Sequence, residues 1–204
     1  MSDIGMYSQG INDYSDNGLI WIGNEGPNVF SFGNIADLPV NVVVWYQNDD
    51  PINYDASFMN VEQPYITYSL AVGDIIEVSM ANGVSGAFAG IHRGSTTLSE
   101  YGQIYQTWGE FTSGDYATID ISREVNMDGN GMEISVSGGC GLDMSVCAYV
   151  CYSGVTCGGA GTYELLDCLP GSQPNAAGAY IDGEWTGGCQ GWTNGGVILV
   201  AFGN

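Results

Sequence analysis

Basic residues are almost absent from this sequence of 204 residues. It has no lysine, two arginines (Arg93 and Arg123) and one histidine (His92), against 23 aspartates and glutamates, and its formal net charge is −21. A surface of this charge repels phosphate groups, so we expect neither nucleic acid nor a membrane as partner. It also predicts adaptation to mildly acidic surroundings, because repulsion between carboxylates weakens as they become protonated.

Metal-binding and membrane-spanning patterns are also missing. A single histidine excludes a multi-histidine zinc or copper site, and we expect no metal and no cofactor. No run approaches the roughly 18 apolar residues of a membrane span, and 32 glycines interrupt most helical patterns. The best short helical candidate is residues 162–168, TYELLDC. The N-terminal MSDIGMYSQG has no apolar signal-peptide core, so we expect a mature secreted form.

Short strand patterns separated by turn residues fill most of the chain. We expect strands at residues 40–46, 65–70, 75–80, 87–91, 116–121, 132–136, 148–152 and 197–202. This spacing predicts an all-β sandwich, and the length fits a single domain, residues 1–204. Residues 1–26 are rich in Gly, Asn, Asp and Ser and could be loosely ordered, except for the apolar residues 19–22, a short strand or an anchored tail.

The cysteines are confined to the last third of the chain. They are Cys140, Cys147, Cys151, Cys157, Cys168 and Cys189. An even number in a glycine-rich segment is typical of three disulfides, although the sequence does not choose among the pairings. A thiolate metal site is the rival reading, but paired CxxC spacing and nearby histidines are lacking. We therefore expect a disulfide-rich loop lobe at residues 138–192, and a secreted protein of the extracellular space or cell wall.

Residues 107–132 contain the acidic residues best suited to a site. In ATIDIS, residues 117–122, alternation turns Asp120 away from the core. Glu110 and its apolar neighbour Phe111 likewise point to opposite faces of their strand. Glu110 and Asp120 would therefore lie side by side if their strands pair. Such a pair can cleave a glycosidic bond, one acting as acid and one as nucleophile or base. The open alternative is that outward strand positions are simply polar.

Other candidate residues carry weaker signals. His92 could serve a nucleophile, but without a G-x-S-x-G motif we expect a surface or turn histidine. Asp128 opens DGNG, which resembles the start of a calcium loop, but the remaining ligands are missing and an Asx turn is favoured. Several aromatic residues in turn contexts could stack on sugar rings or instead cover the lobe. These are Tyr101, Tyr105, Trp108, Tyr180, Trp185 and Trp192.

Four motifs between residues 67 and 132 resemble the thaumatin-like, or osmotin-like, family in the correct order. SLAVGDIIEV (69–78) looks like its strand pair with a glycine turn, SGAFAG (85–90) is similar to SGRIW, TWGEF (107–111) looks like T-L-A-E-F, and IDIS (119–122) looks like Y-D-V-S. TWGEF followed by this segment resembles more closely the fungal secreted proteins grouped with the fourth-numbered Aspergillus allergen. The resemblance implies a thaumatin-like β-sandwich, a secreted fungal source and immune recognition.

The resemblance also implies an acidic cleft that binds β-1,3-glucan, with weak glucanase activity in some members. Only Glu110 and Asp120 match the residues of that cleft. The family arginine is replaced by Trp108, so Arg93 is a spatial substitute, and the next aspartate is replaced by Val125. Glu124 and Asp128 are therefore the neighbouring candidates.

These inferences combine into one leading hypothesis. The protein is expected to be a secreted, monomeric binding protein for cell-wall polysaccharide, most simply β-glucan, with weak glycoside hydrolase activity left open. Glu110 would be the acid and Asp120 the nucleophile or base, and binding residues would be Arg93, Tyr105, Trp108, Glu124 and Asp128. The alternatives are a non-enzymatic secreted effector or allergen that acts by protein contact, and a structural wall protein.

Overall fold

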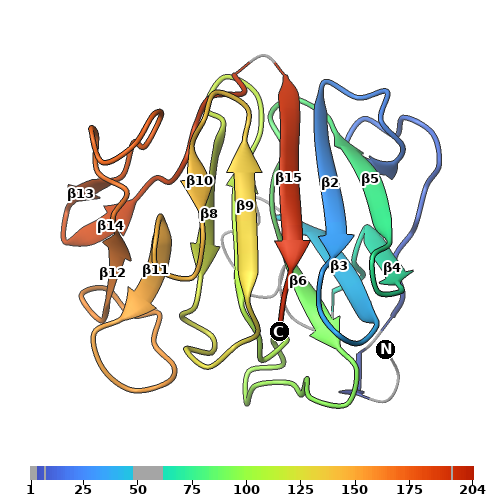
Figure 1. Ribbon diagram of the computed structural model, residues 1–204, viewed down its shortest axis with the longest axis horizontal. Helices are drawn as coiled ribbons and strands as arrows, with labels where there is room; N and C mark the ends of the chain where they lie inside the picture. The colour runs from blue at the N-terminus through green and yellow to red at the C-terminus, as the bar shows by residue number, and fades with distance from the viewer. Residues whose placement is uncertain (1–3, 7, 48–61, 194) are drawn as a thin grey trace.

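Two large β-sheets packed face to face make up the molecule (Figure 1). The computed structural model describes residues 4–6, 8–47, 62–193 and 195–204, and within these residues it has fifteen strands and no α-helix. The all-β prediction is confirmed. Among these described residues, none forms a helix long and apolar enough to cross a membrane.

The first sheet has six strands and contains a segment from late in the chain at its centre. Its order is β1 (Ile20–Ile22), β5 (Ile75–Met80), β2 (Asn28–Asn34), β15 (Gly196–Phe202), β9 (Met132–Val136) and β10 (Gly141–Leu142). β15 runs parallel to β2 and antiparallel to β9. The expected return of residues 197–202 to the sandwich is confirmed, whereas β2 was not expected from the sequence.

The second sheet has seven strands and extends into the cysteine-rich region. Its order is β12 (Tyr163–Leu166), β11 (Ala148–Cys151), β8 (Thr118–Ser122), β7 (Trp108–Thr112), β6 (Ser85–His92), β3 (Val40–Tyr46) and β4 (Ile66–Leu70). The helix predicted at residues 162–168 is wrong. This segment forms β12 because it pairs antiparallel with β11 and buries Leu165, and such tertiary contacts override a weak local preference.

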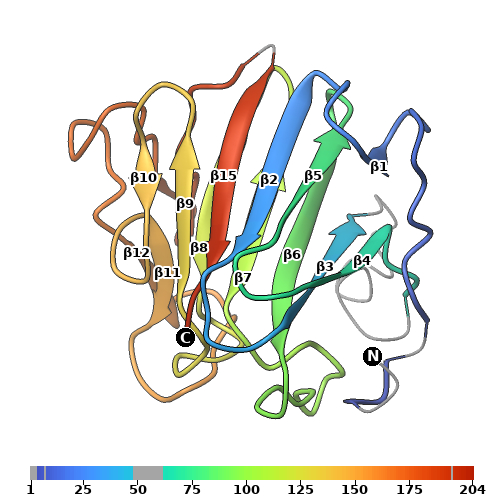
Figure 2. The same ribbon diagram turned by 45° about the vertical axis from the view of Figure 1, so that its right-hand side comes forward.

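Phenylalanine rings from both sheets fill the space between them. The ring centroids of Phe30 on β2 and Phe111 on β7 are 4.9 Å apart, and those of Phe32 on β2 and Phe88 on β6 are 5.0 Å apart. Figure 2 shows the two layers that these rings connect. Because Phe111 points into this core, its neighbour Glu110 must point to the outer face of the seven-stranded sheet.

A second apolar cluster lies on that outer face. Its centre is the pair Trp45 and Trp108, whose ring centroids are 5.5 Å apart, and Met6 and Ile104 pack over it. Residues 10–12, part of the segment expected to be loosely ordered, hydrogen-bond to residues 64–67. Loops and the N-terminal segment thus cover one part of the outer face and leave the part around Glu110 open.

Three disulfides staple the region that follows Cys140. The pairs are Cys140–Cys189, Cys147–Cys168 and Cys151–Cys157. The predicted disulfides are confirmed, but the lobe is more than loops: β11 and β12 continue the seven-stranded sheet, and β13 (Ala179–Ile181) and β14 (Glu184–Thr186) form a hairpin beyond it (Figure 1).

Candidate functional site

Two carboxyl groups face each other across neighbouring strands. Glu110 on β7 and Asp120 on β8 are direct antiparallel partners, and Ala87 occupies the next position across, on β6. Directly opposite residues of such strands have their Cβ atoms about 4.5–5.5 Å apart. The predicted side-by-side placement is therefore confirmed, and the small Ala87 leaves room beside Glu110.

These two residues lie in an open cleft of about 510 Å³. Its floor is the outer face of β7 and β8, one wall is the loop after Tyr101, and the other is formed by the cysteine-rich lobe. Two further acids line it, Glu124 after β8 and Glu184 on β14. The uncharged polar and aromatic lining residues are Gln47, Tyr101, Gln103, Thr112, Thr118, Ser122, Thr156 and Tyr163.

The lobe encloses the Asp120 side chain, which is 6% exposed. Cys189 exchanges two backbone hydrogen bonds with Ile119, at 2.9 and 2.7 Å, and Gly188 lies directly against Ile119 and Asp120 of this strand. Within the described residues, the Oδ1 atom of Asp120 has no hydrogen-bond partner. A buried acceptor without a donor is costly, so this oxygen is a position where a ligand could supply a hydrogen bond.

Burial and mutual repulsion raise the pKa values of three of the cleft acids. Burial, followed by the charges of Glu110 and Glu124, raises the pKa of Asp120 well above its usual range. Burial, followed by the charge of Glu110, raises the pKa of Glu124 to about 8. Desolvation also raises the pKa of Glu110; its side chain is exposed to the cleft, but the surrounding protein limits its hydration. Glu124 therefore keeps its proton near neutral pH, and Asp120 and Glu110 hold theirs more tightly than ordinary carboxyl groups do.

A buried tyrosine lies behind the acids. Its hydroxyl, that of Tyr149, donates to the carbonyl oxygen of Gly187 at 3.2 Å. Burial, with the charges of Asp120 and Glu110, raises its pKa, so it stays a neutral donor and fixes the lobe segment next to Asp120.

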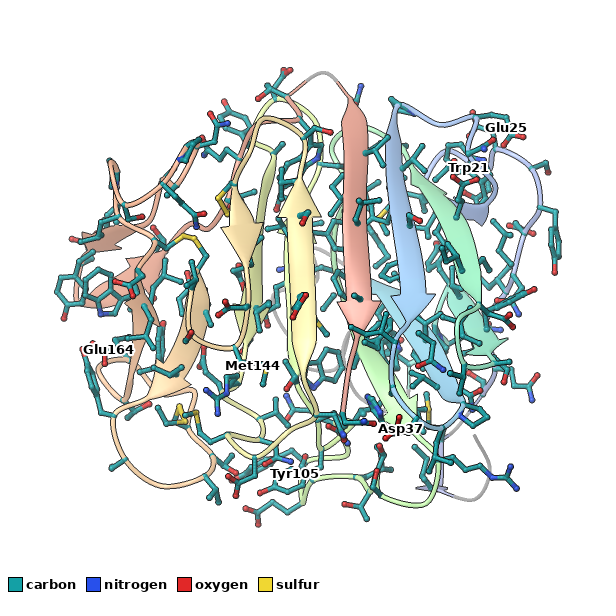
Figure 3. The ribbon with its side chains drawn as sticks, in the orientation of Figure 1. Trp21, Glu25, Asp37, Tyr105, Met144 and Glu164 are labelled. Atoms are coloured by element: carbon teal, nitrogen blue, oxygen red, sulfur yellow. A yellow bond between two sulfur atoms is a disulfide. The ribbon has the colours of Figure 1, made fainter. Side chains whose placement is uncertain are left out.

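Two predicted aromatic binding residues lie outside the cleft. Trp108 shares the outer face with Glu110 but is buried in the second apolar cluster, where its Nε1 donates to the carbonyl oxygen of Ile104 at 2.9 Å. Tyr105 lines a smaller neighbouring pocket together with Tyr101 and Thr156. Figure 3 shows Tyr105 at the lower end of the sandwich.

Two predicted charged binding residues are also absent from the cleft lining. Arg93 is exposed in the turn after β6, so it does not replace the family arginine there. Asp128 is exposed, and its backbone N–H donates to Oδ1 of Asn126 at 2.9 Å. This segment is therefore a turn, as expected. Glu124 is the one additional predicted binding residue that lines the cleft.

The histidine prediction is wrong. His92 ends β6 and is 7% exposed, with its backbone N–H bonded to Oγ1 of Thr96 at 2.9 Å. Burial lowers its pKa to about 4, so the imidazole is neutral near neutral pH. The turn predicted from Arg93 and Gly94 suggested an exposed histidine, because the sequence does not show that the end of this strand is covered.

Glu184 and Tyr163 were missed by the sequence prediction. Both come from the lobe and are brought to the cleft by its strands and disulfides. No local pattern around either residue marks it, because the relevant contact is between segments far apart in the chain. The only sequence feature that could have pointed to these two residues is their position in the predicted disulfide-rich lobe.

Three cysteine sulfurs come close together in the main core. Those of Cys140, Cys147 and Cys189 lie within 4.8 Å of one another. All three belong to disulfides, so they are not the thiolates that bind zinc.

The backbone contact at Gly188 makes a direct prediction about the site. An added Cβ would lie 2.2 Å from the carbonyl oxygen of Ile119 and 3.2 Å from Cβ of Asp120. We expect Gly188→Ala to lower the free energy of unfolding by about 1–3 kcal/mol, as overpacking does, and to displace Asp120. Denaturant unfolding measures this effect. The control is Gly141→Ala, whose Cβ meets no atom of the described residues within 4 Å; equal losses in the two variants would contradict the prediction.

Comparison with known proteins adds no family assignment. No family model matches this chain, and no curated protein matches it. The thaumatin-like resemblance thus rests on the sequence motifs alone.

Proposed function

We propose that the protein is a secreted, thaumatin-like binding protein for cell-wall polysaccharide, held in the cleft over Glu110 and Asp120. The observation that carries the proposal is the cross-strand pair of these two acids on the floor of an open cleft. β-Glucan is the first candidate ligand because the motif resemblance indicates it. The three disulfides are compatible with an extracellular location.

The rest of the lining suits a sugar chain. Thr112 and Thr118 are direct partners on β7 and β8, so their hydroxyl groups flank the acid pair on the same face. Gln103 can donate to and accept from sugar hydroxyls, and Tyr101 and Tyr163 offer aromatic faces for sugar rings. Concave sites with a few polar groups among aromatic side chains are typical of small-ligand binding.

The same pair could hydrolyse a glycosidic bond. Asp120, whose raised pKa keeps it protonated, would give its proton to the leaving oxygen as the bond breaks. Glu110, which opens into the cleft and ionises before Asp120, would attack the sugar carbon as a carboxylate; water, deprotonated by Asp120, would then hydrolyse the resulting ester. This assignment exchanges the roles that the sequence suggested. The direct cross-strand pairing of Glu110 and Asp120 favours hydrolysis with retention of the anomeric configuration, which needs carboxyl groups about 5–5.5 Å apart.

A glucan panel tests both parts of the proposal. Protein is incubated with soluble and insoluble glucans of different linkage, and retention and released reducing sugar are measured. Glu110→Gln should reduce any turnover by more than about a hundredfold while retaining binding. The control is Glu133→Gln, an exposed acid on β9 of the other sheet.

The outcomes separate the candidate functions. Retention with no released sugar leaves a binding module, and full activity in Glu110→Gln removes this residue from the chemistry. No retention on any polysaccharide would contradict the proposal and favour an effector or allergen that acts by protein contact.

A further inference from the structure

The cleft collects carboxyl groups with no cationic side chain beside them among the described lining residues. Four carboxyl groups line it, those of Glu110, Asp120, Glu124 and Glu184, and none of the described lining residues is a lysine, arginine or histidine. Arg123 follows β8 directly but turns its guanidinium to the carbonyl oxygens of Met144, at 2.9 Å, and Met127.

Two buried side-chain oxygens in this cleft have no hydrogen-bond partner among the described residues. Oδ1 of Asp120 and Oγ1 of Thr118 are without a hydrogen-bond partner among the described residues, and both residues line the cleft. They lie two positions apart on β8 and therefore on the same face. Native structures pair nearly all such atoms, so two orphans on one surface indicate a ligand that brings donors.

We propose that the cleft prefers a polysaccharide whose sugars carry protonated amino groups, one of which donates to Asp120 and Thr118 between Glu110 and Glu124. This inference rests on the proposed polysaccharide binding and replaces a neutral glucan with an amino-sugar chain as the better ligand. An ammonium group has three donors and no acceptor, which matches a site made of carboxyl and hydroxyl oxygens.

The net charge of the whole chain also favours a positively charged polysaccharide. At a net charge of −21 the protein attracts polycations and repels polymers of uronic acids. An ammonium group beside Asp120 and Glu124 also favours their ionised forms, which lowers the pKa values that burial has raised. Binding therefore releases protons into solution.

The experiment compares three oligosaccharides of equal length by calorimetry at about pH 6. They are a β-1,4-linked glucosamine oligomer, its fully N-acetylated form and a neutral β-1,3-glucan. We expect the glucosamine oligomer to bind about tenfold more tightly than the other two, and this margin to shrink as salt rises. Repeating the titration in buffers of different ionisation enthalpy should reveal proton release for the glucosamine oligomer alone.

Variants distinguish binding in the cleft from nonspecific attraction to the negative charge of the protein. Asp120→Asn and Glu124→Gln should each remove most of the preference. Asp115→Asn and Glu133→Gln remove the same charge from exposed positions outside the cleft and should leave it intact. Oligolysine serves as a sugar-free polycation. If it binds as tightly as the glucosamine oligomer, or if all four variants behave alike, the inference is overturned.

Failure of the inference differs visibly from failure of the proposed function. A neutral glucan that binds as tightly as the glucosamine oligomer, and is weakened by Asp120→Asn, overturns the amino-sugar preference and leaves polysaccharide binding in place. Absence of binding by all three oligosaccharides overturns both. Calcium ions that bind to the cleft when none of the sugars does would likewise overturn both.

Discussion

Replacing Cys140 and Cys189 together by alanine should lower the free energy of unfolding by about 4 kcal/mol, from the entropy of the closed loop. The two residues are 49 positions apart, the widest separation of the three disulfides. The same bond fixes Cys189 against Ile119, so Asp120 should also lose its cover and its raised pKa. Denaturant unfolding and ligand titration on the same variant measure both effects.

A shorter disulfide provides the comparison. Cys151 and Cys157 are six positions apart, and their joint replacement should cost about 2 kcal/mol. Equal losses for the two variants would contradict the loop argument. Unchanged binding in the Cys140 and Cys189 variant would show that the disulfide does not support the site.

Raising the pH from about 5 to about 8 should weaken the folded state by on the order of 3 kcal/mol. A carboxyl whose pKa is raised by folding binds its proton more tightly in the folded than in the unfolded state. Its contribution to stability is therefore present at low pH and is lost as the pH rises through the pKa of the folded state. Glu124, with a pKa raised to about 8, extends this loss to neutral pH, and Asp120 and Glu110 act in the same direction.

His92 opposes this trend only below about pH 6.5. Its pKa is lowered to about 4, so its contribution is present above the pKa of the unfolded state and is lost toward acidic pH. One histidine acts against three carboxyl groups, and the net slope stays negative.

Glu124→Gln isolates the contribution of one cleft carboxyl at neutral pH. This variant should be more stable than the parent at about pH 8 and nearly equal to it at about pH 5, because glutamine needs no proton. Urea unfolding across this range measures the difference, with the exposed Glu133→Gln as control. A parent stability that rises from pH 5 to pH 8 would refute both this account and the adaptation to acidic surroundings that the composition predicts.

The sequence could predict what depends on local alternation. Successive side chains of a strand point to opposite faces. This alternation predicts that Phe111 and Ile119 face the core while Glu110 and Asp120 face outward, and the structure confirms it. Alternation cannot show which part of a sheet face loops will cover. Trp108 is two residues from Glu110 and on the same face, yet it is buried while Glu110 opens into the cleft.

Several features that depend on distant contacts were predicted wrongly or not at all. β12 is a strand because β11 lies beside it, and Glu184 reaches the cleft because the lobe folds back. Arg93 and Asp128 were selected by family position or proximity in sequence, and neither criterion measures distance in space. The acid pair could be found from the sequence, and the walls that enclose it could not.

The parallel pairing of β15 with β2 also constrains the order in which the fold is assembled. β15 lies between β2 and β9, so until it is synthesised those two strands have no hydrogen-bonded connection and each presents an unpaired edge. Phe202 of β15, which stacks near Phe32, is missing from the core at that stage. The six-stranded sheet therefore stays divided into two parts, and completing it requires the joining of segments distant in the chain, the slowest kind of contact to form.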